Sequence, residues 1–269
     1  MVYARQAPTL SDCVYGQAVG DALGVPYEFM SRGSFECTGM VSGGTNNQPA
    51  GTWSDDTSMA LAICDSIREM GRIDCADIRR RFIRWYRRGS YTIDGTFGVG
   101  GTTARALSSG MGRSSERDNG NGSLMRTVPL AFTNASDDEI RAVSAITHAH
   151  PISMDACVDA VHFARNLIQG MDLIQAAATI GYENLAERPE SEINSGGYVL
   201  DTLESSIWCL VTTNDYASCV LKAVNLGSDT DTTAAVAGAF AGIVYGKDAI
   251  PAEWMRTLRG KGIIECCLF

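Results

Sequence analysis

Residues 234–245 form the longest weakly polar run of the chain, and nearly every one of them is small or apolar. The run is too short to cross a bilayer, which takes about 20 residues, and it carries Gly238 and Gly242 one helical turn apart. A helix that is apolar on all sides must be surrounded by other elements. The pattern therefore predicts a buried central helix over residues 232–245, with its N-terminus inside the protein.

Apolar residues elsewhere recur at helical spacing between capping residues and glycines, and almost no segment alternates with period two. An all-α fold is therefore predicted. With 269 residues and no linker, the chain is expected to form a single compact domain, 1–269. The predicted helices cover 11–24, 54–70, 74–88, a short stretch from 102, 136–150, 152–169, 173–185, 198–211, 216–225, 232–245 and 251–260. The glycine-rich residues 33–51 lack a helical period and are interpreted as a flap over a site.

Charge and cysteine content limit the class of function. The net charge of −9 argues against a general nucleic-acid or anionic-membrane binder. Six arginines on the helix 74–88 form a local exception, read as a solvated face or, less often, a partner-docking patch. The nine cysteines are odd in number and form no C-x-x-C pair, and the N-terminus lacks a secretion-signal pattern, so a reducing cytoplasm is expected.

Two acidic clusters open helices at opposite ends of the chain. Ser54-Asp55-Asp56-Thr57 has the composition of a helix cap, and capping alone would explain it. The helix that follows is nevertheless apolar, which places these carboxylates at a buried end. Asp229 and Asp231 open the central helix and need cations there, because buried charges are costly without partners. Oxygen ligands without nearby cysteine or histidine favour Mg²⁺ or Mn²⁺ over Zn²⁺.

Two glycine-rich loops precede helices, one around Asp94 and one at residues 118–126. Such loops often bind anions through free backbone N–H groups. Pro26 forces the chain out of a helix and leaves Glu28 on a loop, where a glutamate is usually just solvated. His148 and His150 are two residues apart and would not share a helix face, so they are not expected to bind a metal as a pair.

Several motifs, taken together and in order, resemble those of the ADP-ribosylglycohydrolases. They are GDALGVPYEF at 20–29, GTWSDDTSMAL at 51–61, the Asp94 loop, GNGSLMR at 120–126, Thr147-His148, and NLGSDTDTTAAVAGAFAGIVYG at 225–246. Each glycine loop alone is weak evidence. The ordered set with both acidic clusters is specific to the family.

The resemblance implies a compact all-α enzyme with a central dinuclear metal site holding two Mg²⁺ or Mn²⁺ ions. By carry-over the metal ligands would be Ser54, Asp55, Asp56, Asp229, Asp231 and Thr232, with Ser54 standing where the family more often has threonine. Glu28 resembles the family's mobile glutamate near the metals, and Asp94 its loop acid near the ribose. Asn121, Gly122 and Ser123 match a loop that holds the phosphates or the distal ribose, and His148 matches the histidine close to it. Which of Asp55, Asp56, Glu28 or Asp94 acts as the catalytic base stays open.

The function that the resemblance implies is hydrolysis of the glycosidic bond between ADP-ribose and an acceptor, on an ADP-ribosylated protein or a small molecule, with ADP-ribose as product. The form GDALG-x-x-x-EF looks closer to that of arginine-specific members than to that of serine-specific ones, so an N-linked arginine is favoured. Serine, a small molecule and a nucleic-acid base remain alternatives, as does a non-catalytic, crystallin-like relative, against which the retention of both acidic clusters argues.

A second enzyme class shares part of one motif. Residues 229–233, DTDTT, match the D-x-D-x-T nucleophile motif of haloacid dehalogenase-like phosphatases. That motif requires a buried strand just before its first aspartate. Here the preceding KAVNLGS continues a predicted helix, so this interpretation is disfavoured.

Overall fold

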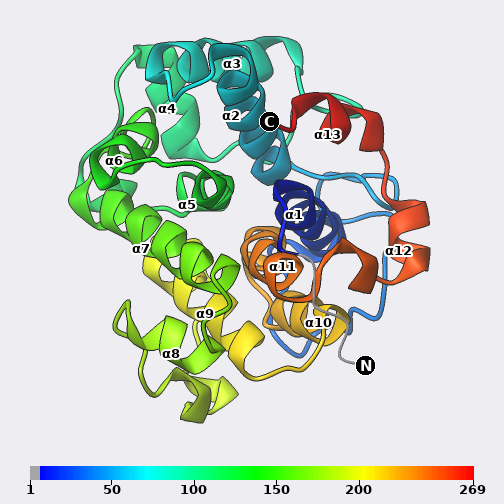
Figure 1. The fold of residues 1–269 in the computed structure, drawn as a ribbon. Coiled ribbons are helices and arrows are strands. Elements are labelled where there is room, and N and C mark those ends of the chain that lie inside the picture. The colour runs from blue at the N-terminus through cyan, green and yellow to red at the C-terminus, as the bar shows by residue number, and fades with distance from the viewer. Residues whose placement is uncertain (1–6) are drawn as a thin grey trace.

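The computed structural model describes residues 7–269, and these residues form helices and loops without a β-sheet (Figure 1). The prediction of an all-α fold is confirmed. The α-helices are α1 (Leu10–Gly24), α2 (Asp55–Met70), α3 (Cys75–Arg88), α4 (Gly101–Ser109), α5 (Leu124–Thr127), α6 (Asp137–Ala145), α7 (Pro151–Ile168), α8 (Leu173–Ala178), α9 (Val199–Val211), α10 (Tyr216–Asn225), α11 (Thr230–Tyr245), α12 (Ala252–Thr257) and α13 (Lys261–Cys267). Short 3₁₀ helices lie at η1 (Val25–Tyr27), η2 (Glu116–Asp118), η3 (Val128–Phe132), η4 (Leu185–Glu187), η5 (Glu190–Glu192) and η6 (Lys247–Ala249).

Helices α1 and α11 lie side by side at the centre of the fold, although they come from opposite ends of the chain (Figure 1). Their backbones touch through glycines. A Cβ added to Gly20 would lie 2.0 Å from the carbonyl oxygen of Ala234, and one added to Gly238 would lie 2.4 Å from that of Gly16. Since residues 230–243 are all buried, the predicted central helix is confirmed. It begins two residues earlier than expected, with Asp229 at its N-cap.

The other helices surround this pair. Helices α2, α7, α9 and α10 all pack against α11, and Phe163 of α7 meets Phe240 of α11 edge to face with ring centroids 4.9 Å apart. Helix α13 packs against α2, which places the C-terminal end of the chain beside that helix (Figure 1). The first turns of α2 and α11 are both buried.

Several predicted boundaries were wrong. The helix predicted over 11–24 begins at Leu10, with Thr9 as its cap, because the Thr9 hydroxyl and the Asp12 carboxylate form a reciprocal capping box. The helix predicted over 173–185 ends at Ala178, and Gly181 then takes a left-handed φ of 88°. The helix predicted over 251–260 is the shorter α12, and α13, which follows it, was not predicted.

Most of the arginines of α3 lie on the protein surface. Arg80, Arg84, Arg87 and Arg88 are exposed, whereas Arg81 is largely buried and forms ion pairs with Asp77 and Asp65.

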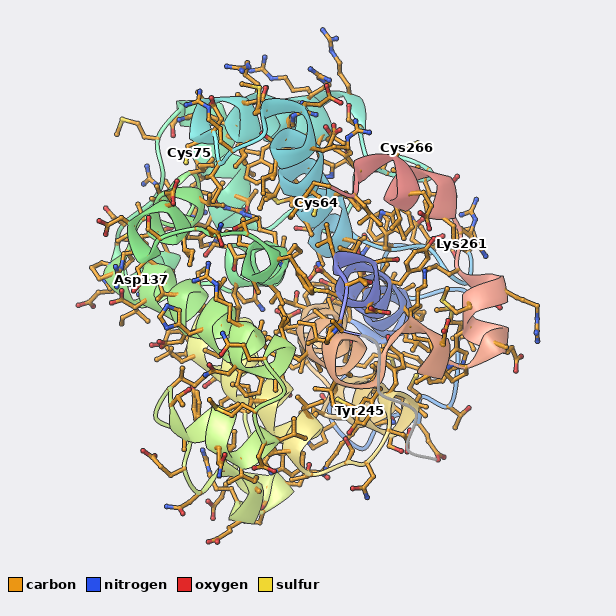
Figure 2. The ribbon with its side chains drawn as sticks, viewed as in Figure 1. Cys64, Cys75, Asp137, Tyr245, Lys261 and Cys266 are labelled. Carbon is orange, nitrogen blue, oxygen red and sulfur yellow. The ribbon has the colours of Figure 1, made fainter. Side chains whose placement is uncertain are left out.

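All nine cysteines are free, and Figure 2 shows Cys64, Cys75 and Cys266 on α2, α3 and α13. Among residues 7–269 we find no helix with the length and apolar character that spanning a membrane requires.

Candidate active site

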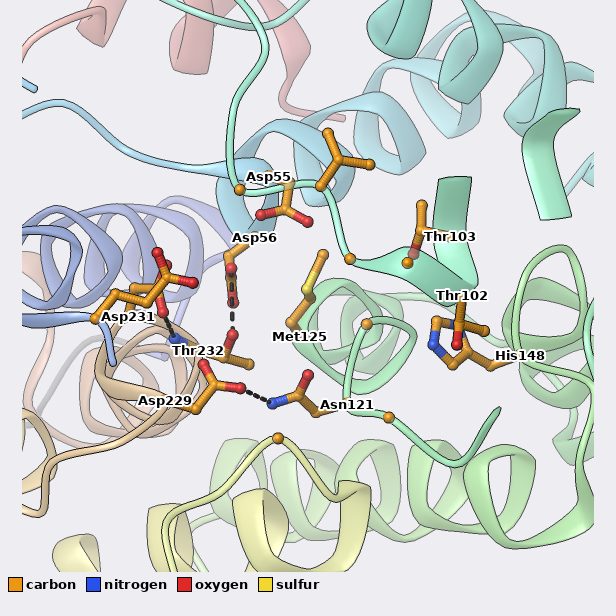
Figure 3. A pocket seen from close by; sticks show the side chains of 18 of the residues that line it. Asp55, Asp56, Thr102, Thr103, Asn121, Met125, His148, Asp229, Asp231 and Thr232 are labelled. Atoms are coloured by element: carbon orange, nitrogen blue, oxygen red, sulfur yellow. Dashed lines mark hydrogen bonds between the residues drawn. The ribbon is translucent and has the colours of Figure 1, made fainter. Parts of the chain in front are cut away.

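A pocket of about 550 Å³ opens where the N-termini of α2, α4 and α11 converge (Figure 3). Loops complete its wall at Glu28, at Asn46, at residues 120–122 and at Gly197. Nine of the residues singled out in the sequence line it: Glu28, Asp55, Asp56, Asn121, Gly122, His148, Asp229, Asp231 and Thr232. Ser54, Asp94 and Ser123 are not among the lining residues.

The first acidic cluster sits on the N-terminal turn of α2. Ser54 is the N-cap, and its Oγ accepts a hydrogen bond from the Asp56 backbone N–H and donates one to Asp56 Oδ2 at 3.0 Å. Asp55 and Asp56 are both buried. Among the described residues, the second oxygen of Asp56, Oδ1, has no hydrogen-bond partner. Buried acceptors in folded proteins are normally paired, so this oxygen is available to bind a cation.

The second acidic cluster opens α11 and faces the first. Thr232 Oγ1 donates a hydrogen bond to Asp56 Oδ2 at 3.4 Å, which joins the two helix ends. Asp229 Oδ2 accepts a hydrogen bond from the Asn121 side chain at 2.9 Å, and Asp231 is buried beside them (Figure 3). The segment before Asp229 is α10 rather than a strand, so the arrangement that a dehalogenase-like nucleophile requires is absent here.

Asp21 of α1 is a site residue that the sequence reasoning missed. One carboxylate oxygen from each of Asp21, Asp56 and Asp231 lies within 4.8 Å of the other two. The Asp21 carboxylate accepts three hydrogen bonds, from Ser54 N at 2.9 Å, Thr57 N at 3.0 Å and Thr57 Oγ1 at 2.6 Å. Because both of its oxygens are engaged in this way, Asp21 holds the N-terminal turn of α2 in place. Its only sequence signal is an acid amid small apolar residues in GDALG.

Burial and mutual repulsion dominate the electrostatics of this cluster. Burial, reinforced by the charge of Asp21, raises the pKa of Asp55 and of Asp56 well above the usual range. Burial and the neighbouring Asp56 do the same to the pKa of Asp231. Burial also raises the pKa of Asp21 to about 6. Carboxylates crowded in this way are stabilised when cations share them, so the donor set fits hard divalent metal ions.

Glu28 follows η1 on the loop that borders the acidic end of the pocket. Burial, with repulsion from Asp229 and Asp21, raises the pKa of this carboxyl to about 7. Asn46 donates a hydrogen bond to Glu28 Oε2 at 3.3 Å, so the irregular segment 33–51 reaches the pocket at this point. The loop is held by Phe29, whose N–H donates to the Ser228 carbonyl at 2.7 Å. Both Phe29 and Ser228 take left-handed φ angles, 70° and 65°, which cost free energy in non-glycine residues.

Asp94 and Ser123 were expected to contact the substrate, but their side chains lie elsewhere. The Asp94 carboxylate forms an ion pair with Arg259, and hydrogen bonds from that guanidinium lower its pKa. Ser123 is fully buried, and its Oγ accepts a hydrogen bond from the Cys157 thiol at 3.4 Å. The structure thus brings neither side chain to the pocket wall.

The glycine-rich loop before α4 forms part of the pocket wall, although its one acid, Asp94, does not. Residues 98–103 all line the pocket, and the N-cap Gly100 leaves the first N–H groups of α4 without a side-chain cap. A Cβ added to Gly98, whose φ is 75°, would lie 2.5 Å from Asp55 Oδ1. Only glycine therefore lets this loop approach the carboxylate, and the free N–H groups beside it suit an anionic ligand.

Comparisons with known proteins agree with this geometry. The family model described as ADP-ribosylglycohydrolase matches residues 8–268. The ADP-ribosylarginine hydrolase Tri1 of Serratia proteamaculans is 34% identical over 90% of this chain and 73% of its own. The ADP-ribosyl-(dinitrogen reductase) glycohydrolase of Rhodospirillum rubrum is 34% identical over 90% of this chain and 87% of its own. A solved structure described as an ADP-ribosylglycohydrolase-related protein complex superposes with a TM-score of 0.83 at 31% identity, covering 96% of this chain and 95% of its own. The chain therefore belongs to the ADP-ribosylglycohydrolase family.

Proposed function

We propose that this protein is a metal-dependent hydrolase that cleaves the glycosidic bond between ADP-ribose and an acceptor, with an N-linked arginine on a protein as the favoured acceptor. The observation that supports it most is the meeting of two acidic helix N-termini in one pocket, joined by the hydrogen bond from Thr232 to Asp56. The family membership and the names of the similar proteins agree with it.

The cofactor in this proposal is a pair of Mg²⁺ or Mn²⁺ ions. Six residues would hold it: Ser54, Asp55, Asp56, Asp229, Asp231 and Thr232. All of them offer oxygen donors, which these two metals prefer. When bound, such ions would polarise substrate oxygens and a bound water molecule.

The other side chains divide into proton carriers and binding groups. Hydrolysis at an anomeric carbon breaks the bond to the acceptor atom, places the hydroxyl of a water molecule on the carbon and passes that water's proton to the leaving atom. Glu28 suits the proton transfer, because its pKa of about 7 lets it give and take a proton near neutral pH. Asp55 and Asp56 remain candidates for the base, and Asp94 is a candidate only if it leaves Arg259. Asn121, Gly122, His148 and the N–H groups of α4 would bind the phosphates and the distal ribose.

An arginine acceptor is favoured on two grounds. Two of the similar proteins, from Serratia proteamaculans and from Pseudomonas putida, are called ADP-ribosylarginine hydrolases and are 34% and 33% identical to this chain. In addition, the form GDALG-x-x-x-EF at residues 20–29 resembles that of arginine-specific members more than that of serine-specific ones. A cytoplasmic location is part of the proposal, because nine free cysteines suit a reducing compartment.

A panel of defined acceptors tests the proposal. Release of ADP-ribose would be measured from ADP-ribosylated arginine, serine and a nucleic-acid base, each with Mg²⁺. The proposal predicts release from the arginine conjugate at least tenfold faster than from the others. Faster release from serine would overturn the acceptor, and ADP-ribose binding without release from any conjugate would identify a non-catalytic family member.

A further inference from the structure

Arg126 is a fully buried arginine whose guanidinium lies behind Gly122, a residue of the pocket wall. Its guanidinium donates to the Gly122 carbonyl at 2.9 Å and to Thr147 Oγ1 at 2.8 Å, and its Cζ lies 4.6 Å from the ring centroid of Phe82. No carboxylate among the described residues pairs with it. The side chain thus links the loop that carries Asn121 and Gly122 to the segment that carries His148.

The Thr147 hydroxyl connects Arg126 to His148. Its Oγ1 lies 2.8 Å from His148 Nδ1 as well as 2.8 Å from Arg126 Nη2. A guanidinium can only donate, so Oγ1 accepts from Arg126, and its own hydrogen can go to Nδ1. If Nδ1 carried the proton instead, the hydroxyl oxygen would accept twice and its hydrogen would be left unpaired in a residue that is fully buried. That cost disfavours the second arrangement by roughly tenfold or more.

The main chain around His148 is fixed as firmly as its ring. The His148 N–H donates to the Ser144 carbonyl at 2.9 Å, and the Ser144 hydroxyl donates to the His148 carbonyl at 3.0 Å. Ring rotation is therefore the only freedom left to this residue, and the bond to Thr147 removes it. The geometry has the features of a preorganised binding group.

The remaining edge of the ring faces the pocket. A Cβ added to Gly122 would lie 2.9 Å from His148 Cε1 and 3.3 Å from Nε2, and one added to Gly120 would lie 3.7 Å from Nε2. His148 lines the pocket with these two glycines, and Figure 3 shows it on the far side of Met125 from Asp229 and Asp231. Within residues 7–269 no side chain or carbonyl accepts a hydrogen bond from Nε2.

Three charged groups act on the ring: Arg126, Asp118 and Arg105. Burial, followed by the charge of Arg126, lowers the pKa of His148 to about 3, against a smaller opposing effect of Asp118. The ring therefore stays neutral at physiological pH. A neutral imidazole has one donor nitrogen and one acceptor nitrogen, and the hydrogen bond at the first decides what the second offers.

We infer that Arg126 and Thr147 hold His148 in the neutral Nε2–H tautomer, so that the ring presents a fixed hydrogen-bond donor to an acceptor oxygen of a ligand at this end of the pocket. Arg126 and Thr147 are positioning residues, and His148 is the binding group. The identity of the ligand rests on the proposed function, in which the oxygen belongs to a phosphate or a ribose hydroxyl of ADP-ribose. The tautomer itself does not depend on that function.

Nitrogen NMR tests the tautomer directly in the ligand-free protein. The chain has three histidines, so long-range ¹H–¹⁵N spectra of uniformly labelled protein are simple, and the variants His150→Gln and His162→Gln assign them. We expect a pyridine-type shift at His148 Nδ1 and a pyrrole-type shift at Nε2, both constant between pH 5.5 and 8.5. Thr147→Ser keeps the hydroxyl and should keep this pattern, whereas Thr147→Val should mix the tautomers. The reverse pattern in the wild-type protein would overturn the inference, whether or not Thr147→Val folds, and so would an unchanged spectrum in folded Thr147→Val.

Calorimetry with ADP-ribose tests the role of the donor. Replacing the ring by one without a nitrogen, His148→Phe, should weaken ADP-ribose binding about three- to tenfold, the usual worth of one hydrogen bond. Thr147→Val should weaken it similarly and Thr147→Ser less than about twofold. Unchanged affinity in His148→Phe would contradict the inference. Absence of ADP-ribose binding in the wild-type protein would instead contradict the proposed function and the ligand assigned to His148. The NMR test of the tautomer would not be affected by that outcome.

Discussion

Thr232 Oγ1 donates a hydrogen bond to Asp56 Oδ2 at 3.4 Å, across 176 positions of sequence. This contact brings the N-termini of α11 and α2 together, and both helix dipoles then favour negative charge at the same place. The carboxylates gathered there repel one another and are buried, as their raised pKa values reflect. Cations bound between these carboxylates would therefore stabilise the protein.

The stability of the chelated protein should fall as pH rises from about 5 to 8. The pKa of Asp21 is raised to about 6 and that of Glu28 to about 7, while unfolded carboxylates titrate near 4. The folded protein therefore binds more protons than the unfolded chain in this window, so the free energy of unfolding decreases with pH. Thermal melts in chelator should show this decline, and excess Mg²⁺ should reduce it, since metals bind the deprotonated groups. Melting temperatures in chelator that rise between pH 5 and 8 would contradict the account.

Asp21→Asn should destabilise the chelated protein, although it removes a charge from a crowded acidic cluster. The three hydrogen bonds to the Asp21 carboxylate hold the turn of Ser54 to Thr57, and an amide cannot accept all of them with its nitrogen facing those donors. We expect a loss of about 1–3 kcal/mol in the free energy of unfolding. Denaturant titrations in chelator check this. Asp55→Asn is the matched comparison, because among the described residues no other residue donates a hydrogen bond to the Asp55 side chain, whereas three such bonds reach Asp21. A more stable Asp21→Asn protein would show that repulsion, rather than support of α2, governs this residue.

Gly20→Ala should destabilise the fold, because a Cβ there would lie 2.0 Å from the Ala234 carbonyl oxygen and would push α1 away from α11. Overpacking of this kind costs about 1–3 kcal/mol, more where the backbone cannot move. Gly262→Ala in α13 is the control, since nothing lies within 4 Å of the added atom. Denaturant melts should separate the two variants. Equal stability in both would mean that the two central helices are not packed as closely as described.

The sequence predicted those parts of the site whose chemistry is local. A few neighbouring residues suffice to recognise the cap at Ser54, the acids after it and the apolar helix after Asp231. The reason is that capping preferences and helical periodicity act over one or two turns. The same holds for α3, whose predicted span 74–88 differs from the observed helix only by its N-cap residue.

Features that depend on distant partners could not be predicted in this way. Asp21 looks like any acid in a helix, and the donors that define its role come from residues 54–57. Arg259, which holds Asp94, lies 165 positions further along the chain. The role of Arg126 likewise depends on Thr147 and Phe82. Contacts in the folded protein determine the roles of such residues, and helical periodicity in a single sequence does not reveal those contacts.

The most direct measurement of the central claim follows ADP-ribose release from an arginine conjugate by the wild-type protein and by Asp55→Asn and Asp231→Asn, each in Mg²⁺ and in chelator, beside their melting curves. Of these three proteins, we expect only the wild type to release ADP-ribose, and only with Mg²⁺. We also expect a metal-induced rise in melting temperature only in the wild type, since binding at 100 times the dissociation constant adds about 2.7 kcal/mol of stability. Asp138→Asn, at the exposed N-terminus of α6, is the control and should behave as wild type. An active and metal-responsive Asp231→Asn protein, or full wild-type activity in chelator after exhaustive dialysis, would contradict the assignment of this pocket as the metal-dependent active site.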